Sequence, residues 1–380
     1  MTSATTQRAL KALTGALGSI VAIVAALLVG AVVIRMAGSD PWQAYEALFN
    51  GAFSNRRAVG ETLVYSSPLI LGGLSFAIAA RAGLFNIGIE GQLVMGGFAA
   101  ALVGAWNFGL PAWIYLPLAL LASAVVGGIW GLIPGVLKAK TGAHEVISTI
   151  MLNYLAFRLI TYLIQKQSRW LPVDPSLQAT DKVVPAARLP RILDGTRVHA
   201  GILIALAAAI ILWIVLYKTA FGYRVRTVGL SRGASSYGGI KWGMTISLAM
   251  AISGVLAGLA GAGESLGLHG RHSAVPPGYG FTAIAVGLVG QNNPIAIIFS
   301  GILFGTLSAG ATKMQAQASV SKEIVSVLQG LIILAVAAVS MADRLPLFNR
   351  KKAPPAAGSD RASEVGTEPD IDARPGPSPL

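Results

Sequence analysis

Long apolar segments, separated by short basic or glycine-rich connections, set the pattern of this chain. Apolar runs recur at about 16–34, 62–80, 81–105 (with a polar start), 112–137, 146–164, 201–217, 243–263, 281–290, 295–311 and 323–341. Most of them approach the roughly 20 residues that a helix needs to cross a bilayer. The pattern predicts an all-α, polytopic membrane protein with about ten transmembrane helices, some of them broken.

The first apolar run, from about Ala16 to Ile34, follows two basic residues. A cleaved signal peptide would have a shorter apolar region and a small-x-small cleavage site after it, so we interpret the run as an uncleaved first span. Residues 1–15 then form an N-terminal arm, and residues 16–341 form the transmembrane domain. The tail, 342–380, is rich in proline and mixed charge, and we predict that it is disordered.

One stretch breaks the apolar pattern sharply. Arg81–Gln92, with the sequence RAGLFNIGIEGQ, places an arginine, an asparagine, a glutamate, a glutamine and three glycines between two apolar runs. Charged groups at membrane depth usually face a cavity or a partner, and non-helical backbone there must be surrounded by protein or line a watery path. The stretch therefore indicates a broken helix along a translocation path. A short cytoplasmic turn before an ordinary helix is the alternative.

Composition supports a membrane protein and limits its chemistry. The 380 residues are 54% hydrophobic and only 12% charged, against about 25% charge in soluble domains. There is no cysteine, so disulfides, thiolate metal sites and cysteine nucleophiles are excluded. The net charge of +13 is typical of basic cytoplasmic loops rather than of nucleic-acid binding, because aromatic residues are not interleaved with basic ones.

The distribution of basic residues predicts the orientation. The loop 218–242 contains five lysines and arginines and no acid, which is the strongest cytoplasmic signal in the chain. Both termini are then cytoplasmic. The long polar segment 165–199 lies outside by parity, although its own basic residues argue against that side. We keep the parity assignment.

The two halves of the chain resemble each other. Each contains a glycine-rich polar interruption with a lone acid after its first long span, Glu90 in one half and Glu264 in the other. The predicted topology puts these interruptions on opposite sides, as inverted repeats around a midplane site would. A chance likeness between glycine-rich helices remains the alternative.

Three apparent catalytic motifs lack their required context. Gly263–Gly267 matches the nucleophile-elbow pattern but ends an apolar run instead of following a strand. His144 and Glu145 begin a zinc-protease motif, but Ser148 occupies the second histidine position. A dinucleotide-like glycine pattern at 278–283 lacks a strand, and no phosphate-binding loop is present. We therefore expect no catalytic residue, metal or cofactor, and any ATP hydrolysis would occur on another chain.

The basic loop also carries a helix signal. Ser231 is a good N-cap, and Ser231–Tyr237 is predicted to form a short helix. Such a helix could dock in a groove of a partner domain. A solvated connector that only fixes the topology is the alternative.

Three segments together resemble a known family. They are Arg81–Gln92, the spaced pattern of glycine, alanine and Gly-Ile over Gly229–Ile240, and GYGFTAIAVGLVG at Gly278–Gly290. They are similar to permease subunits of bacterial ABC importers of the branched-chain amino acid/ribose superfamily. The segment GLFNIGIEGQ most resembles the nucleoside-type, basic membrane lipoprotein-dependent subgroup. The resemblance covers roughly Ala16 to Met341.

The resemblance implies partners and a coupling element. Such permeases lie in the bacterial cell membrane, pair with a second related permease, bind a cytoplasmic ABC ATPase and receive solute from an extracytoplasmic lipoprotein. The family places Gly222–Ile240 against the ATPase. Many relatives carry an asparagine soon after the glycine matching Gly229, whereas this chain has serine and arginine there. The coupling candidates are Arg224, Arg226, Gly229, Ser231, Arg232, Ala234, Tyr237 and Gly239.

The family also places the Asn86–Gln92 break along the central path. We expect Asn86, Glu90, Gln92 and Asn153 to line it, because amides that both donate and accept suit a neutral, hydroxyl-rich solute. Phe85 is a further candidate, either stacking on a base or packing against a neighbouring helix.

Glu90 has an alternative role as a structural acid paired with Arg81 or Arg158, because acids within membranes are commonly paired.

The resemblance implies alternating access, in which ATP closes the partner domains and the coupling helices rock the two bundles about the path. A ribose-type sugar or riboflavin remains an alternative solute. Two alternatives belong to other functional classes. The basic loop and the missing phosphate-binding motif also permit an ATP-independent carrier or channel, which the family resemblance disfavours. A membrane hydrolase would rest on Ser265 alone.

Overall fold

The computed structural model describes residues 21–166, 171–275 and 277–342. Residues up to Val339 belong to one compact unit, and a second unit begins at Ser340, almost entirely outside the described residues. The predicted N-terminal arm 1–15 also lies outside them, as does the predicted tail beyond Ala342.

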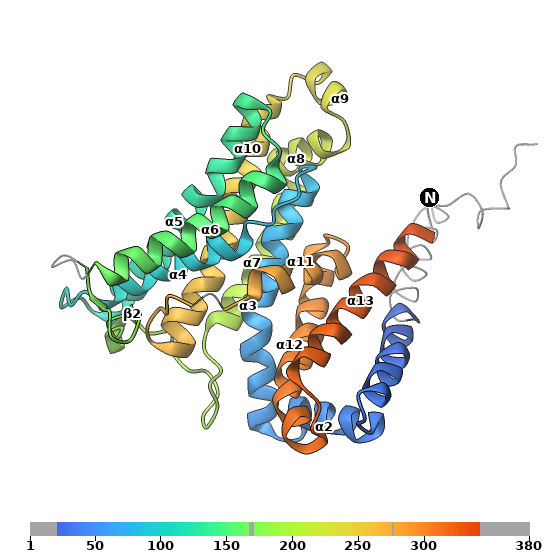
Figure 1. Cartoon of the computed structure of the whole chain (residues 1–380). Helices are drawn as coiled ribbons and strands as arrows, with labels where there is room; N and C mark the ends of the chain where they lie inside the picture. Colours follow the sequence, from blue (N-terminus) through green and yellow to red (C-terminus); the bar gives the residue numbers. More distant parts are fainter. Residues whose placement is uncertain (1–20, 167–170, 276, 343–380) are drawn as a thin grey trace, which may run out of the picture. The chain divides into compact units, whose positions relative to one another are not determined.

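The described chain is almost wholly helical (Figure 1), which confirms the predicted fold class. After a first helix, Val21–Met36, the elements follow in order. They are α2 (Pro41–Phe53), α3 (Arg56–Arg81), α4 (Ile89–Ala105), α5 (Ala112–Thr141), α6 (Glu145–Gln165), β1 (Val173–Asp174), β2 (Ala179–Thr180), η1 (Pro185–Ala187), α7 (Gly201–Lys218), α8 (Ala220–Leu230), α9 (Arg232–Tyr237), α10 (Trp242–Ala262), η2 (Gly263–His269), α11 (Tyr279–Val289), α12 (Pro294–Ala318) and α13 (Lys322–Ala342).

Six of the described helices are long and apolar enough to cross a membrane: α3, α5, α6, α7, α10 continued by η2, and α12. A seventh span is counted if the first helix and α2, which meet at a bend of 119°, form one broken crossing. Three shorter apolar helices remain, which are α4, α11 and residues 323–336 of α13. The predicted number of ten is therefore approximate, because α4 and α11 are too short to cross alone.

Helix α3 lies at the centre of the bundle. The Asn55 side chain caps its start by accepting a hydrogen bond from the Ala58 amide at 2.9 Å. Most of its length is buried, including Pro68 in its interior, and it packs against α10, α11 and α12. It ends at a turn in which Gly83 has φ of +77°, a backbone region that glycine enters without steric cost.

Helices α5 and α10 pack closely through glycines. A Cβ at Gly127 would lie 2.5 Å from the Gly254 carbonyl oxygen, and one at Gly131 would lie 2.5 Å from the Met250 carbonyl oxygen. A Cβ at Gly258 would meet the Ser123 carbonyl oxygen at 2.5 Å. The two backbones are therefore nearly in contact, as the glycine-dense fourth run predicted.

Helices α8 and α9 lie together at one end of the bundle, beside the start of α10 (Figure 1). Ser231 caps α9, because its side chain accepts a hydrogen bond from the Ala234 amide at 3.3 Å. The short helix predicted from the sequence is therefore confirmed, with Ser231 as its N-cap.

Candidate functional site

The break after α3 is held by the side chain of Asn86. Its Oδ1 accepts a hydrogen bond from the Gly88 amide at 2.9 Å. Its Nδ2 donates to Ser253 Oγ of α10 at 2.8 Å and to Gln92 Oε1 at 3.1 Å. Asn86 therefore replaces the helical partners that the backbone loses at this point and ties the break to α10.

Asn153 supports the same break from α6. Its Oδ1 accepts a hydrogen bond from the Gly91 amide at 2.8 Å, and its Nδ2 donates to the Ile87 carbonyl at 2.9 Å. Thr149 Oγ1, one turn earlier on α6, accepts from the Ile87 amide at 3.3 Å. The amide side chain thus joins an acceptor in the break to a donor in the first turn of α4.

Ser253 extends the cluster to α3, since its Oγ donates to the Ser75 carbonyl at 2.7 Å. The cluster is closed to solvent: Asn86, Gln92 and Asn153 are 0%, 1% and 2% exposed. The structure thus brings three of the predicted path residues together, with their polar groups bonded within the chain. Sequence reasoning missed the two serines, whose pattern within apolar helices gave no signal.

Glu90, 1% exposed, lies at the start of α4 and bonds to the start of α11. Its Oε1 accepts a hydrogen bond from the Gly278 amide at 2.7 Å, and its Oε2 accepts one from the Gly280 amide. Neither Arg81 nor Arg158 forms an ion pair with it among the described residues. The carboxylate instead satisfies amides that have no partner within α11 and complements that helix's positive end.

Arg81 lies at the other end of α11. Its Nε donates to the Asn292 carbonyl at 3.0 Å, and its Nη2 donates to the Gln291 carbonyl at 3.3 Å. A cation near the negative end of a helix is favourable. The stretch Arg81–Gln92 therefore holds α11 at both ends, with its acid at the N-terminus and its base just beyond the C-terminus.

Phe85 lies within the break and is 40% exposed. Its ring packs edge-on against Phe76 of α3, with centroids 5.2 Å apart and an interplanar angle of 83°. This is the contact with a neighbouring helix that the sequence offered as one of two roles.

The predicted coupling segment adjoins the same break. A Cβ at Gly229 of α8 would lie 2.2 Å from the Arg81 carbonyl oxygen and 2.9 Å from the Gly83 amide nitrogen. The close approach requires glycine at 229, and it places α8 directly against the turn that ends α3.

The outer surface of α8 and α9 mixes charge with apolar area. Tyr237 is 97% exposed, and Arg224 and Ala234 are also exposed. Two arginines are stacked on aromatic rings, Arg226 on Tyr217 at 5.2 Å and Arg232 on Trp242 at 4.2 Å. The loop that follows turns at Gly239, where φ is +70°. The segment is thus an ordered, protruding surface.

Segment η2 continues α10 as a π-helix and contains further buried polar groups. Ser265 Oγ lies 2.9 Å from His272 Nδ1, so the serine of the elbow-like motif does have a histidine neighbour. Helix α10, and not a strand, leads directly into the motif, and His272 Nε2 has no partner among the described residues. Burial lowers the pKa of His272 to about 4, so the ring is neutral at pH 7. The pair lacks the orienting acid of a hydrolase.

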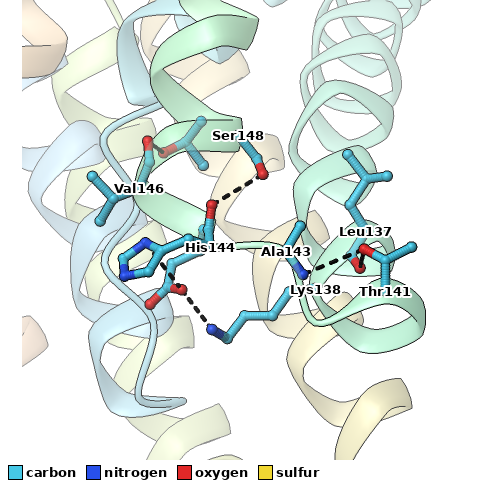
Figure 2. Close-up of polar contacts among 9 residues, drawn as sticks. Leu137, Lys138, Thr141, Ala143, His144, Val146 and Ser148 are labelled. Carbon is cyan, nitrogen blue, oxygen red and sulfur yellow. Dashed lines mark hydrogen bonds and ion pairs between the residues drawn. The ribbon is translucent and has the colours of Figure 1, made fainter.

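The His144-Glu145 motif lies in the turn between α5 and α6 (Figure 2). Glu145 forms an ion pair with Lys138 at 2.6 Å, and the Ser148 hydroxyl donates to the His144 carbonyl at 3.1 Å. Within the described residues no group of three His, Asp or Glu side chains could hold a metal ion. The turn is therefore a structural connection.

Comparison with known proteins gives consistent results. Residues 58–337 match the family described as "Branched-chain amino acid transport system / permease component". The chain is 41% identical to the guanosine ABC transporter permease protein NupP of Bacillus subtilis, over 90% of this chain and 98% of the relative. It is 34% identical to the glucose ABC transporter permease protein TsgB13 of Haloferax volcanii, over 83% and 85%.

A second Bacillus subtilis protein, the guanosine ABC transporter permease protein NupQ, is 30% identical over 65% of this chain and 79% of its own length. The family model and these relatives together span most of the described helices. The chain therefore belongs to the family of permease components of branched-chain amino acid transport systems.

Proposed function

We propose that this chain is a permease subunit of an ATP-driven importer of nucleosides and forms one half of the translocation path. The similarity to NupP, which extends over 90% of this chain, carries the proposal. The broken helix and the ordered protruding segment beside it support a transport role, because such breaks occur where transporters bind and move their solutes.

The partners follow from the same comparison. One organism holds two guanosine permeases similar to this chain, NupP and NupQ, which supports pairing with a second, related permease. We propose that α8 and α9 face the cytoplasm and dock on an ABC ATPase, with Tyr237 and Leu230 as exposed apolar contacts and Arg224 at the polar rim. An extracytoplasmic lipoprotein would deliver the solute, and both termini would be cytoplasmic.

The contacts described above suggest how movement passes through the subunit. A push on α8 reaches the turn 81–83 through Gly229, because no side chain separates the two backbones. Arg81, on that turn, holds the end of α11. Displacement of the coupling segment would therefore shift α11 and uncover Phe85, Asn86, Glu90, Gln92 and Asn153 along the path, alternating its accessible side.

A simple sugar is the second candidate solute. The glucose permease TsgB13 is 34% identical to this chain, only moderately below NupP. Both solute classes present neighbouring hydroxyl groups, which buried amides and carboxylates can bind.

Uptake measurements in cells test the proposal. Cells lacking this chain, and the same cells with the wild-type chain restored, are given radiolabelled guanosine, uridine, ribose or glucose. Loss of nucleoside uptake on deletion and recovery on restoration support the proposal. Unchanged nucleoside uptake with lost sugar uptake would refute the nucleoside assignment and favour the sugar importer. Equal uptake of every solute by both strains would exclude both solutes.

A further inference from the structure

The second lone acid of the chain, Glu264, is buried without a full set of partners. It lies at the start of the π-helical segment η2 and is 6% exposed. Its Oε2 lies 3.5 Å from His269 Nε2. Its Oε1 is buried and has no hydrogen-bond partner among the described residues.

This arrangement is costly if the carboxylate serves only the fold. Leaving one buried polar atom unpaired is destabilising, and more so when the group is charged. Glu90 shows the contrast, because both of its oxygens accept backbone hydrogen bonds. Glu90 is thus used by the fold, whereas Glu264 keeps one acceptor free. Single-turn π-helical segments are also frequent at functional sites.

Segment η2, which contains Glu264, packs against α3, the helix that holds Tyr65. Tyr65 of α3 and Tyr279 of α11 have ring centroids 6.5 Å apart and tilted by 58°, and both interact electrostatically with Glu264. Within the described residues no hydrogen bond is recorded for either hydroxyl group. Three elements, α3, η2 and α11, thus bring together one free carboxylate oxygen, two free hydroxyl groups and two aromatic rings.

We propose that Glu264, Tyr65 and Tyr279 form a solute-binding site of the importer, in which the carboxylate accepts hydrogen bonds from two neighbouring N–H or O–H groups of the solute. The site rests on the proposed function and makes it more specific. A carboxylate only accepts hydrogen bonds, so it selects a solute edge that only donates. The tyrosines supply ring faces for a planar base and hydroxyl groups that either donate or accept.

Two parts of a nucleoside carry such an edge. One is the pair of adjacent N–H groups on a guanine-type base, and the other is the neighbouring pair of ribose hydroxyls. Inosine lacks the 2-amino group of guanosine, and 2′,3′-dideoxyguanosine lacks both hydroxyls. Competition by these two analogues therefore distinguishes the sources.

The experiment measures the concentration dependence of guanosine uptake in cells whose importer contains wild-type chain or Glu264→Gln, with inosine and dideoxyguanosine as competitors. The amide keeps the size of the carboxylate but turns one acceptor into a donor. We expect KM for guanosine to rise about tenfold or more, the loss of one or two hydrogen bonds to a charged group. The maximal rate per importer in the membrane should change little.

The competitors should show which edge is bound. Wild type should prefer guanosine over one of the two analogues, and Glu264→Gln should lose that preference alone. The matched control is Glu46→Gln, because Glu46 is an exposed acid of α2. The KM of this variant should equal that of the wild type. Two further variants, Tyr279→Phe and Tyr65→Phe, remove only the hydroxyl groups and should raise KM by a smaller factor. They replace Glu264→Gln as the test if that variant does not reach the membrane.

The assignment of this site would be overturned if Glu264→Gln leaves both KM and the analogue preference unchanged. If the glutamine variant is absent from the membrane, the same result in both tyrosine variants would overturn it. A fall in uptake that only follows the amount of protein in the membrane would do the same, because it indicates a structural role. Absence of nucleoside uptake by the wild type is a distinct result, which would refute the proposed function and with it the solute assigned to Glu264.

Discussion

Replacement of Glu90 by alanine should release α11 from α4. The carboxylate accepts hydrogen bonds from the amides of Gly278 and Gly280. Gly278 precedes α11 and Gly280 lies in its first turn, so neither amide has a carbonyl partner in an earlier helical turn. A Cβ at Gly280 would lie 2.4 Å from the Glu90 amide nitrogen, so the two backbones are close enough for bulk water to be excluded. Loss of the carboxylate would therefore leave the buried Gly280 amide unpaired, whereas Gly278 is exposed and its amide can bond to water instead.

The size of the effect follows from the buried bond to Gly280. A buried donor left without a partner costs about 1–3 kcal/mol. At about 1.4 kcal/mol for each factor of ten, displacement of α11 should become at least about five times more frequent. Glu90→Gln should have a smaller effect, because its amide oxygen can still accept one of the two hydrogen bonds.

The chain contains no cysteine, so a single engineered thiol can report on this displacement. Val286 of α11 is fully buried and packs beside Gly73 of α3. In a Val286→Cys background, the rate of modification by a membrane-permeant thiol reagent measures how often α11 leaves α3. We expect Glu90→Ala to raise this rate at least about fivefold, with the exposed Glu46→Ala as the matched control. A rate within about threefold of the parent would refute the capping role of Glu90.

Three further predictions concern the same region. Arg81→Ala should raise the Val286→Cys modification rate about twofold to fivefold, less than Glu90→Ala, because it loses two bonds from a partly exposed side chain, and an unchanged rate would contradict its role at the end of α11. Asn153→Ala should destabilise the detergent-solubilised protein by about 2–5 kcal/mol in thermal unfolding, since it leaves one buried amide and one carbonyl of the break unpaired; a loss below 1 kcal/mol would contradict this. Burial lowers the pKa of His272 to about 4 from 6.5, so between those pH values the unfolded chain binds more protons and stability should fall as pH falls, by on the order of 3 kcal/mol. His272→Gln should remove this loss, and equal pH slopes in the two proteins would refute it.

Local signals in the sequence were sufficient for much of the fold. The glycine-dense runs predicted the close contact of α5 and α10, because only hydrogen-sized side chains let two backbones approach. Ser231 predicted the start of α9, because an N-cap is defined within a few residues of sequence. The polar stretch after α3 predicted an interruption of helical structure, and residues 82–88 are non-helical between α3 and α4. That this interruption lines a translocation path stays a prediction.

The partners of the polar side chains could not be predicted in the same way. The sequence offered Arg81 and Arg158 as partners of Glu90, yet the acceptor bonds reach backbone amides 188 and 190 residues away. Every residue except proline has a backbone N–H donor, so the sequence does not show which two amides bond to the Glu90 carboxylate. Ser75 and Ser253 give no signal for a related reason, because serines are common in buried membrane helices and only the packing of α3 against α10 joins them.

The position of Arg81–Gln92 explains why so many polar groups are retained in one short buried stretch. Gly83 and Arg81 contact α8 through Gly229, Arg81 and Glu90 hold the two ends of α11, and Asn86 bonds to α10. An apolar sequence of the same volume would leave the backbone groups at both ends of α11 without these partners. It could not join the protruding segment to α11 through directional bonds that break and re-form at defined points. On this reasoning, hydrophobic replacement of the stretch would weaken the packing of α11 and disconnect movement of α8 from movement of α11.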